Sequence, residues 1–200
     1  MSYPSRSHLK HRVLCGLAAL AVCAGFTGRA SAGGNLIVNG GFETGDFTGW
    51  TLGGNTAGTF VGPPFDGVGH PFSGEHAAVL GAIGSFGTLS QTFATVPDTL
   101  YELTLWGANG GAPPNQVTIT LNGITAFAAT DDPTHDYVLH VFDFTATSTT
   151  YTLLYEFEHG ASGAFVIDDV SVTAVPEPST LTLFALGVGV LAALHWRKRR

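Results

Sequence analysis

Acidic and imidazole side chains lie close together at two places in this sequence. The two runs are Glu156-Phe157-Glu158-His159 and Asp131-Asp132-Pro133-Thr134-His135-Asp136. Glycoside hydrolases use paired carboxylates as acid, base or nucleophile. Carboxylates two positions apart on a strand are, however, more often a solvated edge, and Asp-Asp-Pro-Thr is ordinary turn chemistry. We therefore assign no catalytic residue, expect a protein that is not an enzyme, and keep a polysaccharide hydrolase as a distant alternative.

The basic residues are confined to the two ends of the chain. Every Lys and Arg lies before residue 33 or after residue 174, while fourteen of the fifteen carboxylates lie between these positions. The central segment therefore carries a formal charge of −14 when its histidines are neutral. Nucleic acids, phosphate esters and anionic lipid headgroups are poor partners for it, because no cation is present to neutralise them. Neutral sugars and divalent cations remain as candidate ligands.

Residues 1–32 have the three parts of a secretory signal peptide. Arg6, Lys10 and Arg12 form a basic region, Val13 to Gly25 an apolar region, and Ala30-Ser31-Ala32 a small-residue cleavage site. Both cysteines of the chain fall within this leader, so the mature segment has no disulfide and no cysteine metal site. A lipoprotein interpretation through the second cysteine is weaker, because a branched valine precedes it. Signal peptidase is therefore the expected first partner.

Residues 175–200 consist of a proline-containing spacer, an apolar run and a basic end. The spacer begins Val175-Pro176-Glu177-Pro178-Ser179, and the apolar run extends from Leu181 to Trp196. The basic end consists of Arg197, Lys198, Arg199 and Arg200. As a helix the apolar run would span roughly 24 Å, against about 30 Å of bilayer hydrocarbon, so it is a marginal transmembrane anchor. The basic end is expected to stay cytoplasmic, which leaves the bulk of the protein outside.

This tail closely resembles the PEP-CTERM sorting signal of Gram-negative bacteria, in which a Pro-Glu-Pro motif, a hydrophobic span and an Arg/Lys cluster follow one another. The resemblance covers about one eighth of the chain. It implies recognition by an exosortase, a transient stay in the inner membrane and cleavage near the Pro-Glu-Pro motif. It also implies release or attachment at the cell surface or in the extracellular matrix.

The segment 33–174 predicts a single all-β domain. Short runs rich in Val, Ile, Thr, Phe and Tyr are separated by Gly, Pro, Asn and Asp. The expected strands are Leu36 to Asn39, His76 to Leu80, Gly87 to Phe93, Tyr101 to Ala108, Gln116 to Leu121, Thr125 to Ala128, Tyr137 to Thr145, Thr150 to Glu158 and Ala164 to Thr173. Apolar and polar residues alternate in several of them, which favours two packed antiparallel sheets, a sandwich of jelly-roll type.

Both ends of this segment resemble the galactose-binding-like jelly rolls that include many carbohydrate-binding modules. The resemblance rests on Asn35-Leu36-Ile37-Val38-Asn39-Gly40-Gly41-Phe42-Glu43, on the continuation from Gly45 to Trp50, on Ser73 to Ala78, and on Phe165 to Val172. It implies a structural calcium ion held by Glu43 and Asp168, with the Gly41 carbonyl and Ser73 to His76 as further oxygen donors. Alternatively, Glu43 caps a turn and Asp168 accepts backbone hydrogen bonds.

Aromatic rings, amides and carboxylates are the groups from which a sugar site would be built. The candidates are Trp50, Trp106, Phe86, Tyr155 and Asn115, although for the two tryptophans a place in the core is the stronger interpretation. Gly53 to Gly69 and Gly107 to Asn115 are the better candidates for a variable binding rim. The leading hypothesis is a surface or matrix protein that binds or embeds in extracellular polysaccharide. The runner-up is a structural matrix or biofilm component without sugar affinity.

Overall fold

The computed structural model describes residues 34–63, 70–160 and 163–176, together with residues 187–189, 191 and 194–198 of the tail. The predicted signal peptide lies outside the described residues. Of the predicted sorting motif, Val175 and Pro176 are described, whereas Glu177, Pro178 and Ser179 are not.

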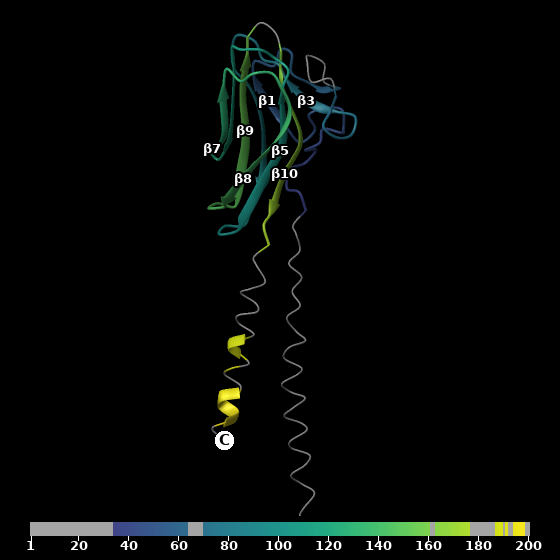
Figure 1. Cartoon of the computed structure of the whole chain (residues 1–200). Helices are drawn as coiled ribbons and strands as arrows, with labels where there is room; N and C mark the ends of the chain where they lie inside the picture. Colours follow the sequence, from purple (N-terminus) through teal and green to yellow (C-terminus); the bar gives the residue numbers. More distant parts are fainter. Residues whose placement is uncertain are drawn as a thin grey trace, which may run out of the picture. The chain divides into compact units, whose positions relative to one another are not determined.

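Ten strands form two five-stranded antiparallel sheets, which confirms the predicted all-β sandwich (Figure 1). One sheet has the order β1-β4-β9-β6-β7 and the other the order β2-β3-β10-β5-β8. The strands are β1 (Thr51–Gly54), β2 (Phe60–Gly62), β3 (Ala77–Leu80), β4 (Gly87–Ala94), β5 (Leu100–Asn109), β6 (Asn115–Leu121), β7 (Ile124–Thr130), β8 (His135–Thr145), β9 (Thr150–His159) and β10 (Phe165–Ala174).

The core lies between the sheets and follows from the alternation in the sequence. Along β9, Tyr151, Leu153, Tyr155, Phe157 and His159 are buried, whereas the intervening side chains are partly exposed. The same period-two pattern holds along β4, β5 and β6. Successive side chains of a strand point to opposite faces, so each of these strands has one inward and one outward row.

The first predicted strand, Leu36 to Asn39, is wrong: these residues form bends and turns. The side chain of Asn35 takes over bonds that a neighbouring strand would make. Its amide nitrogen donates to the Val170 carbonyl, and its oxygen accepts from the N–H groups of Ile37 and Val172. Asn39 also has φ of 53°, which bends the chain away from an extended path.

The sequence did not predict β1 and β2. Both are short, and β1 ends in two glycines, which have low strand propensity. They form by pairing with β4 and β3, respectively, so tertiary contacts decide their conformation.

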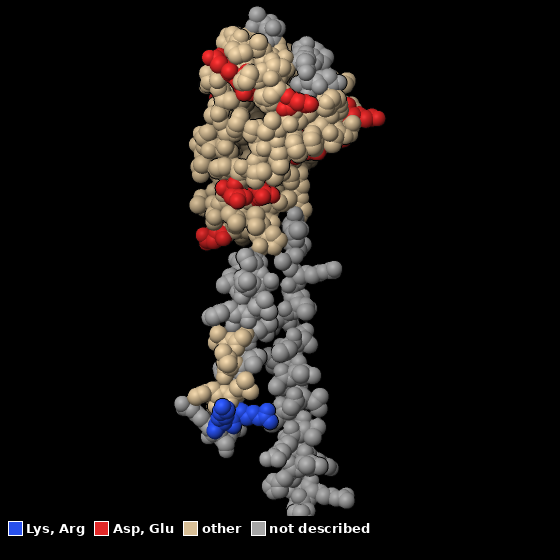
Figure 2. All heavy atoms as spheres, in the orientation of Figure 1, with Lys and Arg blue, Asp and Glu red and all other residues tan. Residues whose placement is uncertain are grey.

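The described part of the tail is helical at residues 187–189, 191 and 194–198. No helix among the described residues is long and apolar enough to cross a membrane. Most of the predicted span from Leu181 to Trp196 lies outside the described residues, so the transmembrane helix stays a prediction. On the face that Figure 2 shows, the described part of the sandwich carries acidic side chains and no basic one, in keeping with the sequence.

Candidate functional site

Three carboxylates and one loop form a compact group where β10 meets the N-terminal segment. We call Glu43, Asp168, Asp169 and residues 73–76 the anchor cluster. Both oxygens of Glu43 accept the N–H of Glu75, at 3.1 and 3.2 Å, and Oε1 also accepts the N–H of His76 at 3.0 Å. These backbone donors lower the pKa of Glu43. Glu43 therefore ties the loop to the N-terminal segment.

Asp168 fixes the other side of the same loop. Its Oδ2 accepts the N–H of Ser73 at 3.1 Å, and its Oδ1 accepts the N–H of Asp169 at 2.7 Å. The side chain of Ser73 donates to Asp169 Oδ1 at 2.9 Å. Asp168 is fully buried, and burial raises its pKa to about 6. No Lys or Arg exists in this part of the chain to neutralise it.

The anchor cluster brings together the residues predicted to hold calcium. A Cβ placed on Gly41 would stand 3.3 Å from Asp169 Oδ1 and 3.8 Å from Asp168 Oδ1, so both carboxylates face the Gly41 backbone. The available donors are oxygens, which suit Ca²⁺ better than a transition metal. Among the described residues, however, no three His, Cys, Asp or Glu side chains are grouped to hold a metal ion. A calcium ion there would need backbone or hydroxyl oxygens in addition.

Two of the predicted sugar-binding aromatics are interior residues, which corrects that prediction. Trp50 is 8% exposed, stacks on Phe42 with ring centroids 5.5 Å apart, and donates its indole N–H to the Asn39 carbonyl. Tyr155 is 0% exposed and points between the sheets. Neither ring can present a face to an external sugar.

Asn115 is also a structural residue, because its amide is already bonded. Its oxygen accepts the N–H of Asp132 at 2.8 Å, and its nitrogen donates to the Asp132 carbonyl at 2.9 Å. The side chain is 4% exposed. The predicted contact with a ligand is therefore wrong for this residue; it holds the turn between β7 and β8 instead.

Trp106 lies on the outer face of the β2-β3-β10-β5-β8 sheet, but another ring covers it. Phe72 stacks on it with centroids 3.9 Å apart and planes at 14°. Tyr137 packs edge-on against Phe72 and donates its hydroxyl to the His70 carbonyl. This group fastens the segment around Phe72 to the sheet, so the face of Trp106 is occupied within the chain. Phe86, outside the strands, is 43% exposed.

The outer face of the β1-β4-β9-β6-β7 sheet is polar, and the sequence analysis did not single it out. We call it the hydroxyl face. None of its outward side chains on the three central strands is buried. They are Thr88, Ser90, Thr92 and Ala94 on β4, Gln116, Thr118 and Thr120 on β6, and Thr150, Thr152, Leu154, Glu156 and Glu158 on β9. The sequence shows the alternation of apolar and polar residues in these strands. It does not show which outer face of the sandwich a loop covers.

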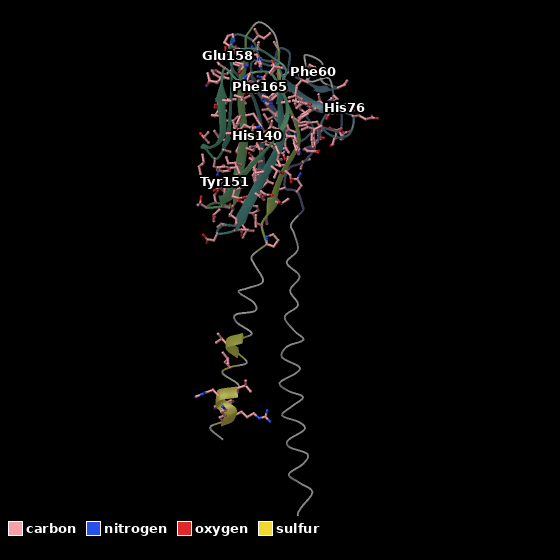
Figure 3. The ribbon with its side chains drawn as sticks, viewed as in Figure 1. Phe60, His76, His140, Tyr151, Glu158 and Phe165 are labelled. Atoms are coloured by element: carbon pink, nitrogen blue, oxygen red, sulfur yellow. The ribbon has the colours of Figure 1, made fainter. Side chains whose placement is uncertain are left out.

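The two predicted acidic runs take different positions. Glu156 and Glu158 both lie on the hydroxyl face, and Glu156 stands between Thr88 and Thr118 in register. Glu158 lies towards one end of the sandwich, as Figure 3 shows. His159 is 2% exposed and has no partner for either ring nitrogen among the described residues. Burial lowers its pKa.

Asp132 and His135 form a pair at the start of β8, with Nε2 2.9 Å from Oδ2. Asp132 is in addition held through its backbone by Asn109 and Asn115. The pair therefore belongs to a bonded turn, as the turn interpretation of this run predicted. Glu156 and Glu158 have no such bonds to the residues that the structure describes.

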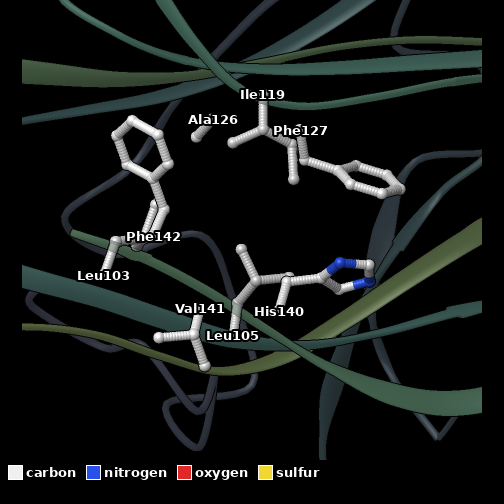
Figure 4. A pocket seen from close by; sticks show the side chains of 8 residues that line it. All are labelled: Leu103, Leu105, Ile119, Ala126, Phe127, His140, Val141 and Phe142. Atoms are coloured by element: carbon white, nitrogen blue, oxygen red, sulfur yellow. The ribbon is translucent and has the colours of Figure 1, made fainter.

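A cavity of about 100 Å³ lies between the sheets near edge strands β7 and β8. Figure 4 shows Ile119, Ala126 and Phe127 on one side and Leu105, Val141 and His140 on the other. His140 packs against Phe127 at 4.3 Å, and burial lowers its pKa. The lining is apolar apart from this one imidazole, so the cavity has few groups with which to fix a polar ligand.

Comparison with known proteins gives separate matches for the tail and for the sandwich. Residues 174–200 match the family described as the PEP-CTERM protein-sorting motif. The motif implies an exported chain that is processed by an exosortase and transiently anchored in a membrane. No curated protein sequence matches the chain.

The sandwich resembles solved carbohydrate-binding modules in fold. TmCBM61, solved in complex with β-1,4-galactotriose, has a TM-score of 0.54 and 19% identity over 72% of this chain and 99% of its own. The N-terminal CBM22-1–CBM22-2 tandem of Paenibacillus barcinonensis Xyn10C has a TM-score of 0.50 and 19% identity over 73% of this chain and 48% of its own. The enzymatically active domain of bacteriophage CBA120 tailspike protein 4 has a TM-score of 0.53 and 13% identity over 70% of this chain and 21% of its own. At these identities the likeness shows the fold alone.

Proposed function

We propose that this chain is an exported, exosortase-processed protein whose β-sandwich binds extracellular polysaccharide through the hydroxyl face. The sorting motif supports the export route. The jelly-roll fold, found also in a module solved with bound galactotriose, supports a carbohydrate ligand. The final location is then the cell surface or the surrounding matrix.

One observation carries the proposal: the hydroxyl face presents polar groups to which no described residue is bonded. Thr118, Thr120, Gln116 and Glu156 make no side-chain hydrogen bond within the described residues. Hydroxyls, amides and carboxylates at strand spacings of about 4.8 Å provide donors and acceptors for the hydroxyls of a sugar chain. The sheet holds them rigidly, so binding orders few side chains.

The outer face of the other sheet fits this role less well. Its Ala77, Ala108 and Val166 form a second small apolar cluster with Tyr137. Phe72 covers Trp106 nearby. Much of that face is therefore used to hold the chain's own segments in place.

Binding by the full-length chain in a nonionic detergent tests the proposal directly. Immobilised chain is exposed to soluble galactan, β-glucan, galactomannan and the producing cell's own polysaccharide, and retention is measured. Saturable binding is the expected result. Retention of none of these polymers would leave a structural matrix component without sugar affinity as the better account.

The same preparations separate binding from catalysis. Glu156 and Glu158 are neighbours in the outward row of one strand, and we propose that they bind sugar hydroxyls without cleaving the polysaccharide. Incubation with each polymer should release no reducing ends. Release that disappears in Glu156→Gln would establish a hydrolase instead.

The export route has its own measurement. Mass spectrometry of the protein recovered from the producing cell's surface and medium should find it shortened at both ends. The expected N-terminus is near Gly33, and the expected C-terminus is near the Pro-Glu-Pro motif. Recovery with Arg197 and Lys198 still attached would show that the tail serves as a lasting anchor.

A further inference from the structure

The hydroxyl face carries two carboxylates and no group of opposite charge. Glu156 and Glu158 have no hydrogen-bond or ion-pair partner among the described residues, unlike Glu43, Asp132 and Asp168. Both are partly buried between neighbouring outward side chains. Their charge is therefore directed at whatever lies on this face.

Nothing else on the face offsets that charge. Between residues 33 and 174 the chain has no Lys or Arg, so no substitute cation can approach from an adjoining loop. The histidines of the described sandwich lie elsewhere: His159 points into the core, His140 lines the cavity, and His135 is paired with Asp132. The remaining two, His70 and His76, belong to the segment around Phe72 and to the anchor cluster.

Carboxylates that lack a partner within the protein attract some ligands and exclude others. An ionised carboxylate accepts two hydroxyl hydrogen bonds, which are stronger than bonds between neutral groups. A ligand carboxylate or sulfate at the same place would lack a donor and would meet two like charges. Placing like charges together is a common means of rejecting a wrong partner.

We propose that Glu156 and Glu158 determine the charge specificity of the hydroxyl face, so that it takes uncharged polysaccharides and rejects polymers of uronic acids or sulfated sugars. The proposal rests on the polysaccharide binding proposed above. Glu156 accepts hydroxyls between Thr88 and Thr118, and Glu158 accepts them beside Gln116. The rest of the domain's negative charge adds a weaker repulsion that salt screens.

The test compares each neutral polymer with the same polymer carrying a charge. Soluble galactan, β-glucan and galactomannan are each presented beside a form oxidised at C6 to the uronate. The full-length chain in nonionic detergent is expected to bind at least one neutral polymer. At low salt it should bind the oxidised form of that polymer at least about tenfold more weakly. In Glu156→Gln/Glu158→Gln this preference should fall to about twofold or less.

A matched control keeps the change in net charge but moves it to the other sheet. Glu102 on β5 and Asp143 on β8 are register partners on the outer face of that sheet. Glu102→Gln/Asp143→Asn also removes two carboxylates and should keep the wild-type preference. Thermal melts of both variants show whether each is folded.

Three results would overturn the inference. Equal binding of neutral and oxidised polymer by the wild type would show that the face does not discriminate by charge. An equal loss of preference in both double variants would assign discrimination to the net charge rather than to Glu156 and Glu158. Absence of binding to every polymer, neutral or oxidised, would refute the polysaccharide function itself.

Discussion

The anchor cluster and the hydroxyl face both contain carboxylates, but these differ in whether the chain's own N–H groups bond to them. In the anchor cluster, Glu43 and Asp168 both accept backbone N–H groups of the loop at residues 73–76. On the hydroxyl face, Glu156 and Glu158 accept no hydrogen bond from any described residue. A carboxylate in a domain without Lys or Arg is therefore structural where N–H groups converge on it and available to a ligand where they do not.

The difference should be largest in stability. Asp168→Ala is expected to lower the free energy of unfolding by about 2–4 kcal/mol, because it leaves the N–H groups of Ser73 and Asp169 without their acceptor at a buried site. Chemical denaturation of the full-length chain measures the change. Glu156→Ala, on the hydroxyl face, should change it by no more than about 0.5 kcal/mol. Equal losses in the two variants would contradict the comparison.

Calcium and pH provide a second test of the anchor cluster. The pKa of Asp168 is raised to about 6 in the folded protein, so without metal its proton favours folding. That contribution is complete below the unfolded pKa near 4 and is lost as the pH rises to about 6. A bound calcium ion would favour the ionised form instead.

The calcium site predicted from the sequence would therefore stabilise the fold by an amount that grows as the pH rises through 6. At a calcium concentration a hundred times Kd it amounts to about 2.7 kcal/mol. Thermal melts at pH 5 and pH 7.5, with calcium or with a chelator, measure it. Asp168→Asn should abolish the effect and Glu158→Gln should preserve it. A wild-type melting temperature that calcium leaves unchanged at pH 7.5 would disprove a calcium site in this cluster.

The fold could be predicted where one row of each strand is buried. In β5 and β9 the alternation of apolar and polar residues determined both the strand and its inner face. It failed at Leu36 to Asn39, where the sequence is strand-like but Asn35 supplies the hydrogen bonds. It also missed β1, whose glycines are strand residues only because β4 lies beside them.

The candidate site was harder to predict because exposure is a property of the assembled sheets. Trp50 and Tyr155 have the side chains that sugar sites use, yet both are buried. Nothing local in the sequence reveals that Phe72, far from Trp106 along the chain, covers its ring. Glu43 and Asp168, which the resemblance assigned to one calcium site, both bond to residues 73–76, and the calcium ion itself stays a prediction.

The hydroxyl face should respond to the loss of single hydroxyls in binding and not in stability. Thr88→Val/Thr118→Val removes the two hydroxyls beside Glu156 and keeps the β-branched shape that suits a strand. We expect affinity for a neutral polysaccharide to fall about tenfold, or roughly 1.4 kcal/mol. Thr104 on β5 and Thr173 on β10 are partly exposed residues of the other sheet's outward rows. Thr104→Val/Thr173→Val therefore also removes two hydroxyls and should leave affinity unchanged. A similar loss in both variants would place the ligand elsewhere.

The smallest expected effect is that of removing the Tyr155 hydroxyl, which tests whether this residue has any role in binding. Its hydroxyl is fully buried and has no partner among the described residues, and burial raises its pKa. An unbonded buried hydroxyl costs free energy, so Tyr155→Phe should leave stability unchanged or raise it by up to about 1 kcal/mol, with polysaccharide affinity unaltered. Tyr151, on the same strand, is the matched case, because its hydroxyl accepts the N–H of Thr147 at 3.1 Å. Tyr151→Phe should therefore lose about 1 kcal/mol in the same denaturation experiment. A loss of polysaccharide affinity in Tyr155→Phe would contradict the assignment of Tyr155 to the core and would indicate that it contacts the ligand.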